Sequence, residues 1–246
     1  MDNTVLISLS HQLAAYRSMD VIANNLANAQ TPAFKREAVK FEEAVSRVAS
    51  GDGQSGQQSV SFVEDKGVVR DLTEGQLNKT GAPFDLAIHG DGYFVVRTAN
   101  GDRYTRNGHF TLDPQGRIVT SAGDQLQGEG GPITITPDDG DVHIAQDGTV
   151  TGKQGQLGKV RLVNFDDERA LVKQGASLYN TDQPPIPVER PHIEQGMLEN
   201  SNVEPVVEIS HMIEVMRAYQ ASANLTQTGD DLKRQAITKL GSMPSA

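Results

Sequence analysis

The chain has 246 residues, of which 37% are hydrophobic and 5% aromatic, and it contains no Cys and no Trp. Its formal net charge of -10 argues against nucleic acid or an anionic membrane as a partner. The missing cysteines exclude disulfides, thiolate zinc sites and a cysteine nucleophile. The low apolar content suggests that part of the chain buries its apolar side against other chains.

The N-terminal residues show neither the basic start nor the uninterrupted apolar core of a cleavable signal peptide. No run approaches the roughly 18 apolar residues that a membrane span needs. We therefore expect no membrane insertion, and any export to follow a route that leaves the chain uncleaved.

The first predicted element is an amphipathic helix at the N-terminus. Its apolar or small residues recur three and four positions apart, at Leu6, Leu9, Leu13, Tyr16, Ala23 and Ala27, with the charged Asp20 interrupting the stripe between Tyr16 and Ala23. This spacing is typical of a helix that packs in a coiled coil, although an ordinary core helix shows the same pattern. The dipeptide Thr31-Pro32 should end the helical segment.

A longer helix is predicted at the other end of the chain. Ser201 or Asn202 is a suitable N-cap, and Pro205 suits the first turn. Apolar residues follow at Val206, Ile209, Ile213 and Met216, and a shifted stripe continues through Leu225, Leu232, Ala236 and Leu240. About 35 helical residues would extend for roughly 50 Å, so this helix needs another long helix as a partner. We expect the two terminal helices to form a hairpin whose remaining apolar surface associates with copies of the chain.

The middle of the chain is predicted to be rich in β-strands. Short apolar runs alternate with Asn-Gly, Asp-Gly and proline turns at spacings of roughly ten residues. Residues 50–60, which are rich in Gly, Ser and Gln, indicate a loop or linker. We therefore predict an α+β chain with an antiparallel β barrel or sandwich at residues 68–199. A helical module of residues 1–35 and 200–246 flanks it, and residues 36–67 form a linker or extended connecting region.

No motif indicates enzymatic chemistry. The carboxylates Asp138, Asp139, Asp141 and Asp147 lack the spacing of a calcium loop and are interpreted as a solvated turn. Residues 152–160 lack the spacing of a phosphate-binding loop, and the six His residues form no zinc-binding pair. An acid site at Asp91, Tyr93 and Arg106 can be imagined, but no recognised motif supports it. We expect no catalytic, cofactor or metal site, and the low aromatic content weakens the alternative of a carbohydrate- or peptidoglycan-binding module.

Three segments, in one order, resemble signatures of the flagellar rod, hook and hook-associated protein family. Residues 23–35 read ANNLANAQTPAFK, residues 90–96 and 104–113 read GDGYFVV and YTRNGHFTLD, and residues 202–219 read NVEPVVEISHMIEVMRAY. The family usually has Gly where this chain has Ala33. A left-handed backbone is costly for Ala, so we expect a differently shaped turn here.

The resemblance implies a structural subunit of the bacterial flagellar basal body. In place of an acid site it implies turns at Gly90 and Gly92 and a hairpin element at residues 106–108. Length and the ending GDDLKRQAI at residues 229–237 look most like proximal rod members, with distal rod members as the alternative. The implied partners are other rod subunits, further copies of the chain and the flagellar type III export apparatus, and the implied location is the rod that crosses the periplasm. The family's termini are typically disordered in the monomer and become helical on assembly.

The expected assembly interface combines the helical stripes with polar residues of the N-terminal turn. These residues are Leu6, Leu9, Leu13, Tyr16, Ala23, Asn24, Asn25, Asn28, Val206, Ile209, Ile213, Met216 and Tyr219.

Overall fold

A computed structural model describes residues 2–48, 58–175 and 177–241. The chain divides into two compact units, each built from separate stretches of sequence. The first unit contains Met1–Ala27, Glu37–Asp71 and Glu204–Ala246, and the second contains Asn28–Arg36 and Leu72–Val203. The chain therefore passes between the units four times. Residues 28–36 and 200–203, which we assigned to the helical module or its linker, belong to the second unit because their hydrogen bonds go there.

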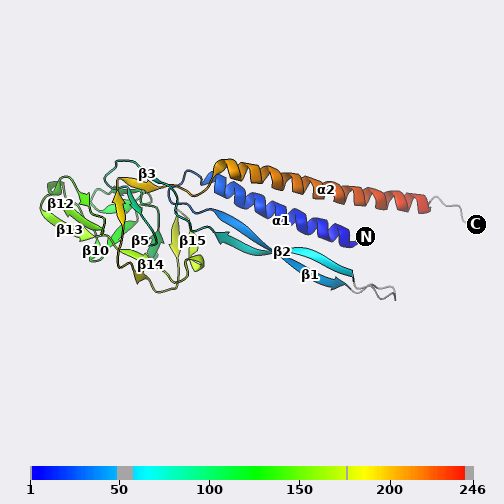
Figure 1. Ribbon diagram of the computed structural model, residues 1–246, viewed down its shortest axis with the longest axis horizontal. Coiled ribbons are helices and arrows are strands. Elements are labelled where there is room, and N and C mark those ends of the chain that lie inside the picture. The colour runs from blue at the N-terminus through cyan, green and yellow to red at the C-terminus, as the bar shows by residue number, and fades with distance from the viewer. Residues whose placement is uncertain (1, 49–57, 176, 242–246) are drawn as a thin grey trace, which may run out of the picture. The chain divides into compact units, whose positions relative to one another are not determined.

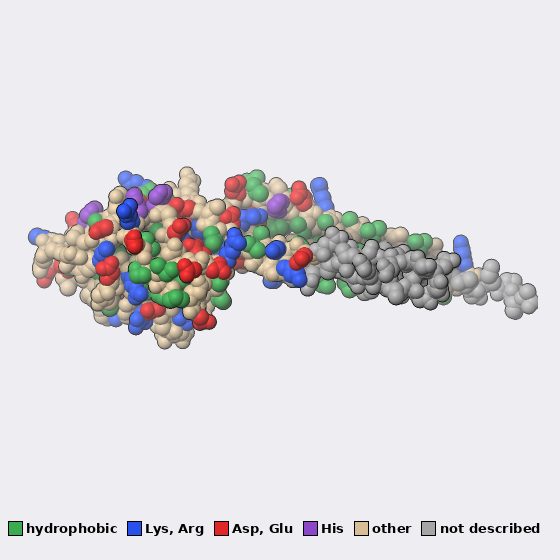
Figure 2. Space-filling model, turned by 60° about the horizontal axis from the view of Figure 1, so that its bottom comes forward, with side chains coloured by type: hydrophobic (Ala, Val, Ile, Leu, Met, Phe, Trp, Pro, Cys, Tyr) green, Lys and Arg blue, Asp and Glu red, His purple; other side chains and the backbone are tan. Residues whose placement is uncertain are grey.

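The first unit consists of two helices and a β-hairpin (Figure 1). Helix α1 (Asp2–Ala27) lies beside α2 (Pro205–Gly241), and it also contacts β1 (Glu37–Val48) and β2 (Gln58–Arg70). The helices are antiparallel, because Gln12 bonds to Thr226 while Asn25 bonds to Glu208. Hydrophobic side chains are visible along the surface of this unit (Figure 2). Among the described residues, neither helix has the length and apolar content of a membrane span.

Most of residues 36–67, predicted as a linker or extended connecting region, forms the hairpin of β1 and β2 and not an unpaired linker. Eleven residue pairs run from Glu37↔Arg70 to Val48↔Gln58, with a register shift between Val39 and Phe41. Backbone hydrogen bonds hold such a two-stranded ribbon together. Its strands therefore need no long apolar run that could be recognised in the sequence. Of the predicted loop at residues 50–60, the part up to residue 57 lies outside the described residues, and the rest begins β2.

The second unit is an antiparallel β domain, which confirms the predicted placement of such a domain between N- and C-terminal helices. Its main sheet follows the order β15-β16-β6-β5-β9-β8-β7, with β10 and β14 attached to β9 and β5 and with β17 attached to β14. Smaller sheets are β11-β12-β13, β18-β4 and β19-β3. Every pairing between the described strands is antiparallel.

The elements of this unit are short. They are β3 (Leu77–Lys79), β4 (Leu86–Ile88), β5 (Tyr93–Thr98), β6 (Gly101–Thr105), β7 (Phe110–Leu112), β8 (Ile118–Thr120), β9 (Gln125–Gly128), β10 (Gly131–Pro132), η1 (Pro137–Asp139), β11 (His143–Ile144), β12 (Thr149–Gly152), β13 (Gly155–Lys159), β14 (Leu162–Asn164), η2 (Glu168–Ala170), β15 (Val172–Gln174), β16 (Leu178–Asn180), β17 (Ile186–Pro187), β18 (Ile193–Gln195) and β19 (Met197–Glu199).

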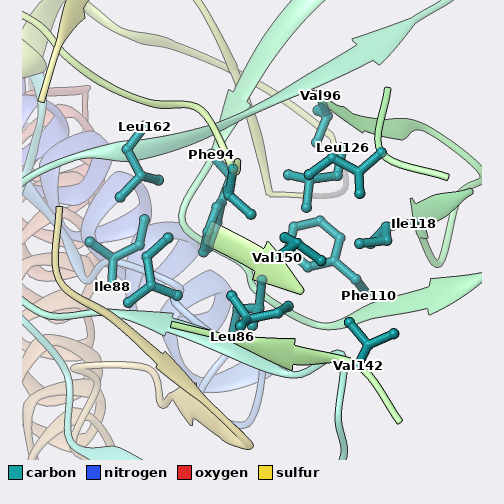
Figure 3. Close-up of a cluster of buried hydrophobic side chains, with 14 of the residues drawn as sticks. Leu86, Ile88, Phe94, Val96, Phe110, Ile118, Leu126, Val142, Val150 and Leu162 are labelled. Carbon is teal, nitrogen blue, oxygen red and sulfur yellow. The ribbon is translucent and has the colours of Figure 1, made fainter. Parts of the chain in front are cut away.

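Two groups of buried side chains hold the second unit together. The larger is aliphatic with two phenylalanines, and Phe94, Leu86, Ile88, Leu126 and Val150 are fully buried in it (Figure 3). The smaller lies on the other face of β5, where Tyr93, Tyr104, Phe165 and Tyr179 stack edge to face or tilted. Alternate residues of β5 thus supply both groups, which is why the sequence YFVV carries no polar position.

Ala33 adopts the left-handed backbone that we expected the chain to avoid, with φ 55°. The residue is buried, and its N–H donates to the carbonyl of Glu199 over 2.8 Å. A left-handed alanine costs about 1–2 kcal/mol, and this hydrogen bond together with the burial of Ala33 and Phe34 offsets that cost. The prediction of a different turn at Ala33 is therefore wrong.

Candidate functional site

The first unit has a helix–helix contact that is not the predicted apolar stripe. A row of partly or fully covered residues recurs four and three positions apart on each helix, in line with the bonded pair Gln12 and Thr226. On α1 this row includes Ser8, Gln12, Ala15, Met19, Ile22 and Leu26, and on α2 it includes Glu208, Met212, Val215, Tyr219, Ser222 and Thr226. The contact is apolar near Ile22 and polar or small towards Ser8. The helices do pair, but through a face turned away from the predicted stripe.

The predicted stripe of α1 faces outward. Leu9, Leu13 and Tyr16 are 49%, 63% and 60% exposed. Val21 and Asn25, which lie outside this stripe, are buried, and Asn25 bonds to Glu37 at the start of the β-hairpin. We call Leu9, Leu13 and Tyr16 the open face of α1. Leu6 lies in α1, but its side chain is outside the described residues.

The stripe of α2 is also open. Val206, Ile209, Ile213 and Met216 are between 42% and 78% exposed. Tyr219, predicted with them, is half-buried on the helix–helix contact instead. The first unit therefore covers several polar or small residues between its helices while leaving large aliphatic residues in solvent.

Asn25 fastens three elements of the first unit. Its amide nitrogen donates to the carbonyl of Glu37 (2.8 Å) and to Oε2 of Glu208 (3.2 Å), and its Oδ1 accepts from the N–H of Glu37 (2.9 Å). Asn25 and Glu208 are both fully buried. The last turn of α1, the start of β1 and the first turn of α2 thus meet at one side chain. Ala23 and Asn24 remain exposed, and Asn28 lies in the second unit, where it accepts hydrogen bonds from Thr31.

The second unit contains a buried ion cluster of Lys35, Arg106 and Glu199. Glu199 accepts from Nζ of Lys35 at 2.7 Å, from Nε of Arg106 at 3.0 Å and from the N–H of Gly75 at 3.0 Å. The three side chains are 3%, 7% and 1% exposed. Each ion also has further partners: Lys35 donates to the carbonyl of Thr73, and Arg106 to those of Ile88, Gly90 and Gly92.

Burial is the largest influence on the pKa values of Lys35 and Glu199 in this cluster. Burial lowers the pKa of Lys35, against the opposite pull of Glu199. Burial alone would raise the pKa of Glu199, but the charges of Arg106 and Lys35 outweigh it and hold that pKa below its usual value. One buried anion therefore compensates two buried cations, and removing it would leave two like charges without their counterion.

The ion cluster and Asn202 join the three segments through which the chain passes between the units. The carbonyl of Glu199 accepts from Ala33, and Oδ1 of Asn202 accepts from the N–H of Arg36 at 2.6 Å. The amide nitrogen of Asn202 donates to the carbonyl of Thr73 at 3.0 Å. Residues 28–36, 72–76 and 199–203 are thus tied to one another within the second unit.

Sequence reasoning missed this cluster. We interpreted Arg106 as part of a turn, whereas its side chain crosses the interior of the unit. The available signal was the position of the three residues, since Lys35 ends one motif, Arg106 lies in the second and Glu199 shortly precedes the third. Spacing within a motif cannot show that charges about 70 and 90 residues apart meet.

Two of the other sequence candidates, Asp139 and Asp147, behave as turn residues. Asp139 accepts from the hydroxyl and N–H of Thr136, and Asp147 accepts from the N–H and hydroxyl of Thr149. These hydrogen bonds lower the pKa of both carboxyls. Tyr93 donates to Glu168, and burial raises the pKa of its hydroxyl. Within the part of the chain that the structure describes, no group of three His, Asp or Glu side chains is placed to hold a metal ion.

Three family models match the chain, each around one of the motifs. The model for "Flagella basal body rod protein" matches residues 11–35, that for "Flagellar hook protein FlgE/F/G D1 domain" matches residues 87–152, and that for "Flagellar basal body rod FlgEFG protein C-terminal" matches residues 194–239. Each matched segment supplies one member of the ion cluster, which links the three motifs physically.

Full-length relatives agree with these matches. The flagellar basal-body rod protein FlgF of Caulobacter vibrioides is 43% identical over 98% of this chain and 99% of its own length. FlgF of Mesorhizobium japonicum is 36% identical over the same shares. The rod protein FlgG of Bacillus subtilis is 31% identical over 89% of this chain and 92% of its own length. The chain belongs to the family of flagellar basal-body rod proteins.

Proposed function

We propose that the chain is a structural, non-enzymatic subunit of the flagellar basal-body rod that polymerises through the open face of α1 and the stripe of α2. Family membership supports the rod assignment. The observation that carries the mode of assembly is the outward direction of both apolar faces. Within that proposal, Leu6, Ala23, Asn24 and Asn28 contribute at the edge of the interface.

The energetics fit a polymer better than a stable pair. The seven exposed side chains of the two faces are on average about half covered, so burying the rest of each contributes about 1 kcal/mol, or roughly 5–10 kcal/mol in total. Association of two chains costs about 4–15 kcal/mol in lost translational and rotational freedom. One such contact is therefore marginal, whereas a subunit with neighbours on both stripes gains from several contacts at once.

Packing as a coiled coil is the form of assembly that we propose. The residues of both stripes recur three and four apart, which lets side chains of one helix fit between those of a neighbour. Alignment over nearly the full length of FlgF relatives, against 87–92% coverage with FlgG relatives, favours the FlgF type and with it the proximal rod. The proposal includes partnership with other rod subunits and delivery by the flagellar type III export apparatus.

Replacing Ile213 by Asp tests the mode of assembly. Ile213 is 44% exposed, so the monomer should keep its fold, while a charge on the stripe should prevent packing against a neighbour. We expect loss of rod incorporation and of swimming in cells that carry only the variant. His211→Asp adds the same charge to the same helix, away from the stripe, and should retain both.

Two results would contradict the proposed interface. Normal motility of the Ile213→Asp strain would show that the stripe of α2 is not buried in the rod. Equal loss of incorporation for His211→Asp would show that any added charge on α2 is harmful, which would remove the specific role of the stripe.

A further inference from the structure

The last strands of the second unit pair with its first strands. β18 pairs with β4, where Ile193 lies opposite Ile88, and β19 pairs with β3, where Glu199 lies opposite Leu77. Among the described strands, β18 is the only ladder partner of β4, and β19 is the only ladder partner of β3. The strands of the main sheet all lie between these early and late segments in the sequence.

Residues 193–203 hold other parts of the unit as well, and we call them the closing segment. The N–H of Gly196 donates to the carbonyl of Asp85 at 2.7 Å. Oε1 of Gln195 accepts from the N–H of Ile144, in β11, at 3.0 Å. One stretch of chain near the end of the unit therefore bonds to β3, β4 and β11.

The closing segment covers a strand that has no exposed residue. Leu86, Ala87 and Ile88 of β4 are each 0% exposed, and Ile193 of β18 is 1% exposed in the same buried group. Without β18, the backbone N–H and C=O groups along that edge of β4 would be buried without partners, or the whole strand would stay in water. Burying such groups unpaired is costly, and leaving β4 in water removes Leu86 and Ile88 from the core. The core is therefore incomplete until the closing segment is in place.

The buried charges require the same order of events. Glu199, in the closing segment, follows Arg106 by 93 residues and Lys35 by 164 residues. A unit that closed before Glu199 was available would contain two buried cations without their counterion, which is strongly destabilising. Strand pairing and charge balance thus both make closure depend on the end of the unit.

We propose that the closing segment decides when the second unit folds, so that the main sheet is not stable until residues 193–203 are present. A chain that emerges N-terminus first then keeps its β domain unfolded until 203 of its 246 residues are available. The competing expectation is that the main sheet, which contains no residue of the closing segment, folds by itself. Pairing of segments so far apart in the sequence is slow, which delays closure further.

Late closure has a use in the proposed function, and in this respect alone the inference rests on it. A subunit delivered N-terminus first by the export apparatus would not fold its β domain before the closing segment had arrived. The order of folding is measured on the purified chain, so its failure would leave the rod assignment intact. Absence of the chain from rods would refute the proposed function and would leave the order of folding unaffected.

Separating the closing segment from the rest of the chain tests the proposal. A protease recognition sequence is inserted between Glu189 and Arg190, two exposed residues that lie between β17 and β18. The full chain is unfolded in urea and cut there, and the two pieces are separated. After removal of urea, the N-terminal piece should recover less than about a tenth of the native near-ultraviolet circular dichroism of the core tyrosines, because the losses described above approach the whole stability of a domain. Adding back the C-terminal piece should restore the signal.

A matched control separates the closing segment from α2. The same recognition sequence is inserted between Gln220 and Ala221, exposed positions of α2, so that the N-terminal piece loses part of this helix but keeps the closing segment. This piece should recover the tyrosine signal by itself. Recovery of the native signal by the piece that ends at Glu189 would overturn the proposal. Equal failure of both N-terminal pieces would also overturn it, because α2 would then decide folding.

Pulsed hydrogen exchange during refolding of the wild-type full chain gives a second readout, which holds even if an inserted sequence prevents folding. We expect the amides of β5 and β9, in the main sheet, to become protected in the same kinetic phase as those of β4 and β18. Protection of β5 and β9 in an earlier, separate phase would show that the main sheet folds without the closing segment, and would overturn the proposal.

Discussion

Replacing Glu199 by Gln should destabilise the second unit by about 3–5 kcal/mol, the range for breaking a buried ion pair by removing one partner. The structure gives the reason. Glu199 accepts from Lys35, Arg106 and Gly75 at 2.7–3.0 Å, and its side chain is 1% exposed. Gln keeps the shape but loses the charge, so two buried cations remain without a counterion. Since a domain has about 5–15 kcal/mol of stability in total, such a loss approaches unfolding.

Urea denaturation followed by near-ultraviolet circular dichroism measures this loss, because Tyr93, Tyr104 and Tyr179 are all packed in the second unit. Glu194→Gln is the matched control, since Glu194 is 35% exposed and pairs with His192 at the surface, and it should cost less than about 1 kcal/mol. A double-mutant cycle with Lys35→Met should show coupling of about 1–3 kcal/mol. A loss below about 1 kcal/mol for Glu199→Gln, or strict additivity with Lys35→Met, would refute the electrostatic account.

The same variant has a defined pH signature. The pKa of Glu199 is lower in the folded unit than the usual 4.5. Its contribution to stability is therefore present above pH 4.5 and is lost as the pH falls through the folded pKa. Wild-type protein should lose more stability on acidification across this window than Glu199→Gln does. Parallel acid profiles for the two proteins would show that Glu199 is not the group that titrates.

Three further substitutions probe single structural claims, each by chemical denaturation. Ala33→Val should lower the free energy of unfolding by more than about 1 kcal/mol, because a β-branched side chain does not tolerate φ 55°. Ala33→Gly should stay within about 1 kcal/mol of wild type. Equal effects of the two substitutions would contradict backbone strain at Ala33. Asn25→Ala should lower the free energy of unfolding by about 2–4 kcal/mol, since it removes three hydrogen bonds at a buried site. It should also expose the last turn of α1 to hydrogen exchange. Unchanged protection would contradict the role of Asn25 in joining the three elements. Gly108→Ala should prevent folding of the second unit, because the new Cβ would lie 1.6 Å from the carbonyl oxygen of Leu86. A soluble variant with the circular dichroism spectrum of the wild type would show that the backbone around Gly108 shifts easily.

The ends of the chain illustrate how far periodicity reaches. Recurrence every three or four residues correctly predicted that Leu9, Leu13 and Tyr16 share one face of a helix, and Pro205 correctly marked the start of the other helix. Periodicity shows which side chains lie together on a helix, but it does not show what that face meets. The helices pair through a neighbouring face that includes polar and small residues, so the apolar stripe that suggested an intramolecular seam remains open.

The middle of the chain shows a similar division. Turn dipeptides and short apolar runs predicted the antiparallel β domain, and β5, β7 and β11 lie where those runs are. The hairpin of β1 and β2 was missed because its stability comes from backbone pairing and contact with α1, and the Gly- and Ser-rich residues near its turn suggested a linker.

The residues alone determined that two helical ends enclose an antiparallel β domain, since the period of apolar residues and the turn dipeptides are local properties of the chain. Tertiary structure decided which faces are covered and where the charges go. Lys35, Arg106 and Glu199 become one buried site only after the sheets bring their segments together. The left-handed Ala33 is stabilised by its hydrogen bond to Glu199 and by burial, and both depend on the tertiary structure. Burial and pairing of this kind depend on neighbours far away in the chain, and no local pattern encodes them.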